Sequence, residues 1–159
     1  MAGEKPFEKH LIRTGLVTES ALARIRTEAD TRGVRLIDVL ITGGYASSEQ
    51  AYGALAAFCE MRFVMPSKLE LEPELSKRVP ARYATHYGFV PVEERNGTLV
   101  VALSDPLNTQ LLDDIRQIVR QRIEPVVTTP EEILRVTKTL YGVGADTVEK
   151  ILINEEHAG

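Results

Sequence analysis

A tandem repeat in the first sixty residues places the strongest constraint on how this chain can fold. A shift of 29 positions, which carries Gly15 onto Gly44, also superimposes Leu11 on Leu40, Ile12 on Ile41, Thr18 on Ser47 and Leu22 on Ala51. Each copy is typical of a helix that ends at a left-handed glycine and is followed by a second helix with a hydroxyl cap. The repeat predicts about four helices, in two pairs whose apolar faces pack together.

Local signals refine this helical region. Thr18 is expected to cap the second helix, and the stretch from Asp30 to Gly33 is expected to break it. A capping box formed by Ser47 and Gln50 opens the fourth helix. The proline-rich middle of the chain predicts a connector with two short helices near 73–78 and 81–86, because proline is tolerated in a first helical turn.

The second half changes to the period of strands. Pro91 lies inside an extended segment, which favours an edge strand or the start of a strand, and Asn96-Gly97 is a strong two-residue hairpin turn. The order then continues with a buried strand at 99–103, a helix capped by Asn108, a strand at 123–127, and a final helix that a Thr129–Glu132 capping box opens. The predicted fold is α+β, with the helical repeat packed on a small β-β-α-β-α subdomain.

We therefore expect four segments along the chain. They are a helical tandem-repeat subdomain at 1–62, a connector at 63–88, the β-β-α-β-α subdomain at 89–141 and a tail at 142–159. Apolar residues of the tail favour two alternatives, a short amphipathic turn against the body or a partner, or a frayed terminus. These residues are Val148, Ile151 and Leu152.

Composition restricts the class of protein. The formal net charge is −4, which disfavours binding to nucleic acid polymers or to an anionic membrane surface. No apolar run approaches the roughly 20 residues of a membrane-spanning helix, and the N-terminus has no signal-peptide core. Cys59 is the only cysteine, so no intramolecular disulfide can form, and a reducing cytoplasm is the expected compartment.

The motifs of common catalytic sites are missing from the sequence. No phosphate-binding loop with its lysine occurs, and the histidines at 10, 86 and 157 lack metal-ligand spacing. Cys59 lies on the apolar side of a predicted helix, where a small buried side chain is the expected role. Asp113 and Asp114 are adjacent on a helix and therefore diverge. We predict no enzyme activity, no metal site and no cofactor.

Three further features bear on binding. Ser104-Asp105-Pro106 is expected to supply turn and cap chemistry between a strand and a helix. The basic residues Arg116, Arg120 and Arg122 could contact an acidic partner, but interleaved acidic residues favour a mixed solvated surface. The third is the repeat itself, with Arg35 at the entrance of its second copy.

Residues 6 to 141 resemble the N-terminal domain of the type II secretion and type IV pilus assembly ATPases, the GspE/PilB/MshE type. The resemblance is carried by the hairpin, the A-x-x-D-P turn ending at Pro106, the L-D-D-I-R helix, the E-P-V strand and the final helix ending in Y-G. The resemblance implies a domain that precedes an ATPase core and docks on an inner-membrane platform partner. The ATPase core itself is not in this sequence.

Some members of that family bind cyclic di-GMP through two tandem motifs, R-L-G-x-x-L-V-x-x-G with a following L-x-x-x-L-x-x-Q. Laid on this sequence, the motifs imply a nucleotide site formed by Leu11, Gly15, Arg35, Leu36, Leu40 and Gly44. Several positions depart from the pattern. Pro6 and Glu8 replace an arginine and a glycine of the first copy, Ile37 replaces a glycine of the second, and Ala29 and Phe58 replace the two glutamines.

Two functional hypotheses follow. The leading one is a non-catalytic, cytoplasmic interaction and regulatory module that binds a protein of a secretion, pilus or motility assembly, such as an inner-membrane platform protein or an ATPase. Such a partner would place the chain at the periphery of the inner membrane. The alternative is a cyclic di-GMP receptor that uses the degenerate motif around residues 6–29 and 35–58. In that case the repeat serves as a ligand site, whereas in the first it is a helix-packing scaffold.

Overall fold

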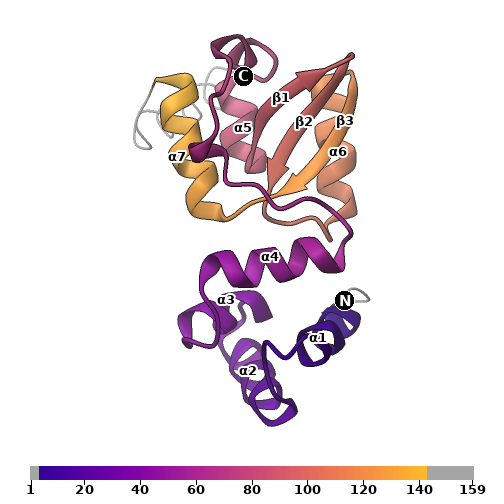
Figure 1. The fold of residues 1–159 in the computed structure, drawn as a ribbon, viewed down its shortest axis with the longest axis vertical. Coiled ribbons are helices and arrows are strands. Elements are labelled where there is room, and N and C mark those ends of the chain that lie inside the picture. The colour runs from indigo at the N-terminus through magenta and orange to yellow at the C-terminus, as the bar shows by residue number, and fades with distance from the viewer. Residues whose placement is uncertain (1–3, 143–159) are drawn as a thin grey trace. The chain divides into compact units, whose positions relative to one another are not determined.

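The computed structural model describes residues 4–142, and its elements form the predicted α+β fold (Figure 1). The chain divides between Glu60 and Met61 into two compact units. Residues 143–159 of the predicted tail lie outside the described residues, and Gly142 ends the last helix. The four-segment division of the sequence stays a prediction.

The first unit contains four helices. They are α1 (Glu4–Arg13), α2 (Glu19–Arg32), α3 (Leu36–Thr42) and α4 (Ser48–Phe58). Thr18 accepts a hydrogen bond from Ala21 N, which confirms the predicted cap of α2. The predicted break at residues 30–33 is confirmed only at its last residue, because α2 continues through Arg32 and ends at Gly33, where φ is +68°. Exposed polar side chains are compatible with a helix, whereas the left-handed glycine ends it.

The second unit is built on a sheet with the order β1-β2-β3. The antiparallel strands β1 (Phe89–Arg95) and β2 (Thr98–Leu103) are joined by Asn96 and Gly97, both at positive φ, as a type I′ hairpin requires. Strand β3 (Arg122–Val127) pairs parallel to β2 after the crossover helix α6 (Thr109–Val119). The edge position of β1 confirms the prediction from Pro91, and the pairing shifts register between Pro91 and Glu93.

Alternate residues of the sheet serve two apolar clusters. Leu99, Val101 and Leu103 pack with α6 and with α5 (Ala81–Tyr87), whereas Val100 and Ala102 pack with α7 (Pro130–Tyr141). Figure 1 shows α6 and α7 on opposite sides of the strands. Successive side chains of β2 point to opposite faces of the sheet, and helices cover both faces. Strand β2 is therefore buried on both faces.

The connector of the second unit differs in detail from the expectation. The expected helix near 73–78 is a 3-10 helix, η2 (Pro73–Lys77), and a further 3-10 helix, η1 (Pro66–Lys68), lies ahead of it. Phe63 forms an isolated parallel bridge with Val127, and Val64 N donates to Val127 O at 2.9 Å. This bridge adds one residue pair next to β3, and no pattern in the sequence predicted it.

Candidate functional site

The two repeat loops of the first unit have the same backbone geometry. In the first copy, the amides of Leu16 and Val17 both donate to Leu11 O, and in the second, the amides at the equivalent positions donate to Leu40 O. Gly15 and Gly44 have φ of +81° and +77°. The 29-residue repeat of the sequence is therefore a structural repeat, and each loop depends on a glycine at its left-handed position.

The six residues predicted for a nucleotide site fall into two groups. Leu11, Leu36 and Leu40 are buried in the core of the first unit, where they pack its helices. Gly15 and Gly44 lie on exposed loop tips, and no atom outside their immediate neighbours stands within 4 Å of an added Cβ at either glycine. Arg35 is the one side chain of this set with a charge. The role of these residues in nucleotide binding stays a prediction.

Arg35 is held at the entrance of α3. Its guanidinium donates to the Tyr52 hydroxyl at 3.0 Å and lies 3.8 Å from the Asp38 carboxylate. The Asp38 carboxylate also accepts from Arg35 N at 3.2 Å, and thereby caps the first turn of α3. Arg35 therefore links the start of α3 to α4, and 41% of its side chain stays exposed.

Three of the departures from the family motif, at Glu8, Ile37 and Phe58, are integrated into the packing of the first unit. Glu8, at the position of a motif glycine, is buried and forms an ion pair with Arg26 on α2. This carboxylate raises the pKa of Arg26 by hydrogen bonding and by charge attraction. Ile37 is buried in the core. Phe58, at the position of a motif glutamine, packs its ring 5.6 Å from that of Phe7 and joins α4 to α1.

In the second unit, a groove of about 380 Å³ runs between α7 and the connector. Its lining residues are Pro66, Ser67, Leu69, Leu71 and Pro73 from the connector, and Arg135, Val136, Thr139 and Leu140 from α7. Leu69 is 52% exposed, so the groove presents an apolar side chain at its rim.

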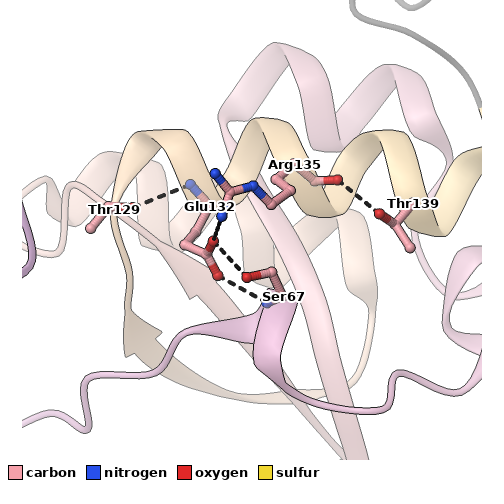
Figure 2. Close-up of polar contacts among 5 residues, drawn as sticks. All are labelled: Ser67, Thr129, Glu132, Arg135 and Thr139. Atoms are coloured by element: carbon pink, nitrogen blue, oxygen red, sulfur yellow. Dashed lines mark hydrogen bonds and ion pairs between the residues drawn. The ribbon is translucent and has the colours of Figure 1, made fainter.

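Glu132 holds two of the residues that line this groove, Ser67 and Arg135 (Figure 2). Its carboxylate is buried and accepts from Ser67 N at 2.9 Å, from Ser67 Oγ at 2.8 Å and from Arg135 Nη1 at 3.1 Å. The predicted capping box is therefore only half present. Thr129 accepts from Glu132 N at 3.2 Å, but the Glu132 side chain turns to the connector instead of back to Thr129. No local signal in the sequence pointed to Ser67, which is 65 residues away.

A second pocket of the same unit, of about 260 Å³, lies between α5 and α6. It is lined by Tyr83 and Tyr87 from α5, by Asp114, Gln117 and Ile118 from α6, and by Arg120 at the end of α6. The sequence singled out Arg120 only as one of three basic residues. The tertiary structure brings Arg120 close to Tyr83 and Tyr87.

The described residues offer few candidates for other kinds of site. Among residues 4–142, no group of three or more His, Cys, Asp or Glu side chains is arranged to hold a metal ion. Cys59 is only half-buried at the end of α4, which corrects the expectation of a buried side chain, and burial raises the pKa of its thiol. No helix in this part of the chain has the length and apolar character needed to cross a bilayer.

Comparison with known families decides the relationship of the chain. Residues 59–146, which are more than half of the chain, match the MshEN domain. The chain belongs to the MshEN domain family.

Relatives of this MshEN protein agree with the assignment. The type IV pilus assembly ATPase PilB of Myxococcus xanthus is 25% identical over 146 residues, which cover 89% of the chain and 25% of PilB. The chain therefore spans about a quarter of the length of that relative. A structure of MshE with cdg, the abbreviation of cyclic di-GMP, has a TM-score of 0.78 at 21% identity and covers 85% of the chain and 98% of its own. The structure of the N-terminal domain of XpsE has a TM-score of 0.64 at 20% identity, and the match covers 85% of the chain and 93% of the XpsE domain.

The family match and the candidate nucleotide site occupy different parts of this MshEN chain. The match begins at residue 59 and so contains the groove of Glu132 and the pocket of Arg120. The repeat of residues 6–58 lies outside the matched range, although the alignment with PilB extends over most of the chain. The residues predicted for the nucleotide site therefore lie outside the range that matches the MshEN domain.

Proposed function

We propose that this MshEN domain is a non-catalytic regulatory and protein-interaction module that docks a protein of a secretion, pilus or motility machinery. The partner would be an inner-membrane platform protein or an assembly ATPase, and the chain would act in the cytoplasm at the periphery of the inner membrane. The observation that carries the proposal is the alignment of nearly the whole chain with a quarter of PilB. The chain also shares the fold of the XpsE N-terminal domain. Such a match supports a role beside an ATPase core.

Complex formation tests this proposal. The purified chain is mixed with a type IV pilus assembly ATPase, or with the cytoplasmic part of a platform protein, from the same cells and analysed by size-exclusion chromatography with light scattering. We expect a complex of defined stoichiometry with at least one of them, and no ATP hydrolysis by the chain alone. ATP turnover by the purified chain, or the failure of both partners to bind, would contradict the proposal.

A second candidate function is that of a cyclic di-GMP receptor. It is supported by the fold shared with the structure of MshE with cdg and by the repeated loop geometry around Gly15 and Gly44. Arg35 would supply the cation, because its guanidinium is partly exposed at the start of the second copy. The buried Glu8, paired with Arg26, would not face the phosphates as a bare carboxylate.

Calorimetric titration with cyclic di-GMP, with cyclic di-AMP and GTP as controls, separates the two candidates. If the chain is a receptor, Arg35→Ala abolishes the heat of binding, whereas Arg32→Ala, which changes an exposed arginine of α2, leaves it unchanged. The absence of heat at millimolar ligand leaves the repeat as a packing scaffold. Equal binding by Arg35→Ala and by the parent chain removes Arg35 from the site.

A further inference from the structure

The pocket between α5 and α6 ends at an arginine whose backbone conformation favours glycine. Arg120 follows the last residue of α6 with φ of +59°, in the left-handed region. At three other helix ends, the left-handed position is occupied by Gly33, Gly88 and Gly142. A side chain in this region is strained relative to glycine, and such residues concentrate where their side chains are used for function.

Two hydrogen-bond donors that line this pocket have no acceptor among the described residues. Arg120 is exposed, and within the described part of the chain its guanidinium forms neither a hydrogen bond nor an ion pair. The Tyr87 hydroxyl, which belongs to the same pocket, also has no hydrogen-bond partner among residues 4–142. By contrast, Arg116 of the same helix pairs with Asp113 at 3.1 Å. Two donors without acceptors suit a carboxylate, which a guanidinium binds in a bidentate manner.

The remaining lining residues favour a protein segment over a free polyanion. The Asp114 carboxylate lies in the pocket and accepts from Gln110 Nε2 at 2.9 Å, so a ligand with several negative charges would be repelled. A peptide can present a carboxylate to Arg120 and N–H donors to Asp114. Ile118 is half-buried and adds an apolar contact. Tyrosine and arginine are also the residues that most often dominate binding energy at protein interfaces.

We propose that this pocket docks a protein segment that presents a glutamate or aspartate side chain to Arg120 and Tyr87, with an apolar neighbour against Ile118. The inference rests on the proposed function as an interaction module, and it adds the surface used and the chemistry of the partner. The exposed charge of Arg120 then serves recognition, which explains why the position is not a glycine.

Nuclear magnetic resonance titration of the full chain tests the surface with defined probes. The probe is the capped peptide acetyl-Leu-Glu-Leu-amide, and the matched probe is acetyl-Leu-Gln-Leu-amide, which lacks the charge. Inorganic phosphate is the third arm. We expect saturable shifts of the amides of Tyr87, Ile118 and Arg120 with the glutamate peptide, and a loss of about tenfold or more in affinity with the glutamine peptide.

Two variants show whether the effect belongs to Arg120. Arg120→Gly is expected to lower the affinity for the glutamate peptide to that for the glutamine peptide. The melting temperature of this variant is expected to be unchanged or raised, because glycine removes the strain of the left-handed backbone conformation. Arg116→Gln, which removes an exposed arginine of the same helix, is expected to bind like the parent chain. A variant that melts at or above the parent temperature excludes misfolding as the cause.

Several results would overturn the assignment. They are the absence of saturable shifts around the pocket, equal binding of the two peptides, tighter binding of phosphate than of the glutamate peptide, and unchanged binding by Arg120→Gly. These failures are distinguishable from failure of the proposed function. If Arg120→Gly forms the complex with the assembly protein as well as the parent chain does, the surface is wrong and the module is retained.

Discussion

The replacement of Glu132 by alanine tests how the connector is held on α7. Glu132 is 1% exposed, and its carboxylate accepts two hydrogen bonds from Ser67 and one from Arg135. After the replacement, Ser67 loses the acceptor of both its amide and its hydroxyl. Arg135 behaves differently, because its side chain is 65% exposed and regains water. The loss therefore falls mainly on the two contacts with Ser67.

The magnitude follows from these contacts. A hydrogen bond to a buried charged group contributes about 1.5 kcal/mol or somewhat more, so two such bonds give a loss of about 3 kcal/mol in the free energy of unfolding for Glu132→Ala. The exposed pair with Arg135 adds at most about 1 kcal/mol. Ser67→Ala removes only the hydroxyl bond, and we expect about half of the effect, roughly 1.5 kcal/mol.

Hydrogen exchange of the second unit provides the assay. The amides of β2 report the opening of this unit, and the Ser67 amide reports the contact itself. Glu131→Ala is the matched control, because Glu131 is the exposed neighbour on the same helical turn and is expected to change stability by no more than about 0.5 kcal/mol. Unchanged protection of both β2 and Ser67 in Glu132→Ala would refute the reasoning.

Three further predictions are checked by urea unfolding of the full chain. Gly53→Ala is expected to stabilise the chain by about 1 kcal/mol, since Gly53 lies inside α4 with open space around an added Cβ, whereas Gly44→Ala is expected to destabilise by a similar amount because φ is +77°; the same sign for both would contradict the backbone argument. Thr128→Val should raise stability by about 1 kcal/mol, because the Thr128 hydroxyl is buried without a partner among residues 4–142, and a loss of stability would speak for an unseen partner. Tyr141→Phe should lose about 1.5 kcal/mol with its 2.6 Å hydrogen bond to the carbonyl of Val79, and a neutral result would show that this bond is not needed.

Much of the local structure could be predicted from short patterns. The cap at Thr18, the capping box of Ser47 and Gln50, and the left-handed glycines of the repeat are decided by residues within one helical turn. The hairpin at Asn96 is decided in the same way. In each of these cases, residues close together in the sequence decide the local conformation. The sequence alone is therefore sufficient to predict it.

The candidate sites were harder to predict, because they join residues that are distant along the chain. A Glu at the third position after Thr129 indicated a capping box, yet its carboxylate binds Ser67, which the folded connector brings close. Cys59 was expected inside and lies half-exposed at a helix end. The pocket at Arg120 depends on the approach of α5 to α6, and no spacing within either helix indicated it.

By itself, the sequence determined the order of the main helices and strands, the repeat of the first unit and the membership of the MshEN family. Only the tertiary structure decided which buried charges find partners, as Glu8 does with Arg26 and Glu132 with Ser67. The physical reason is that helix ends and turns are governed by bonds between near neighbours. The satisfaction of a buried carboxylate, in contrast, depends on whichever donors the completed core places beside it.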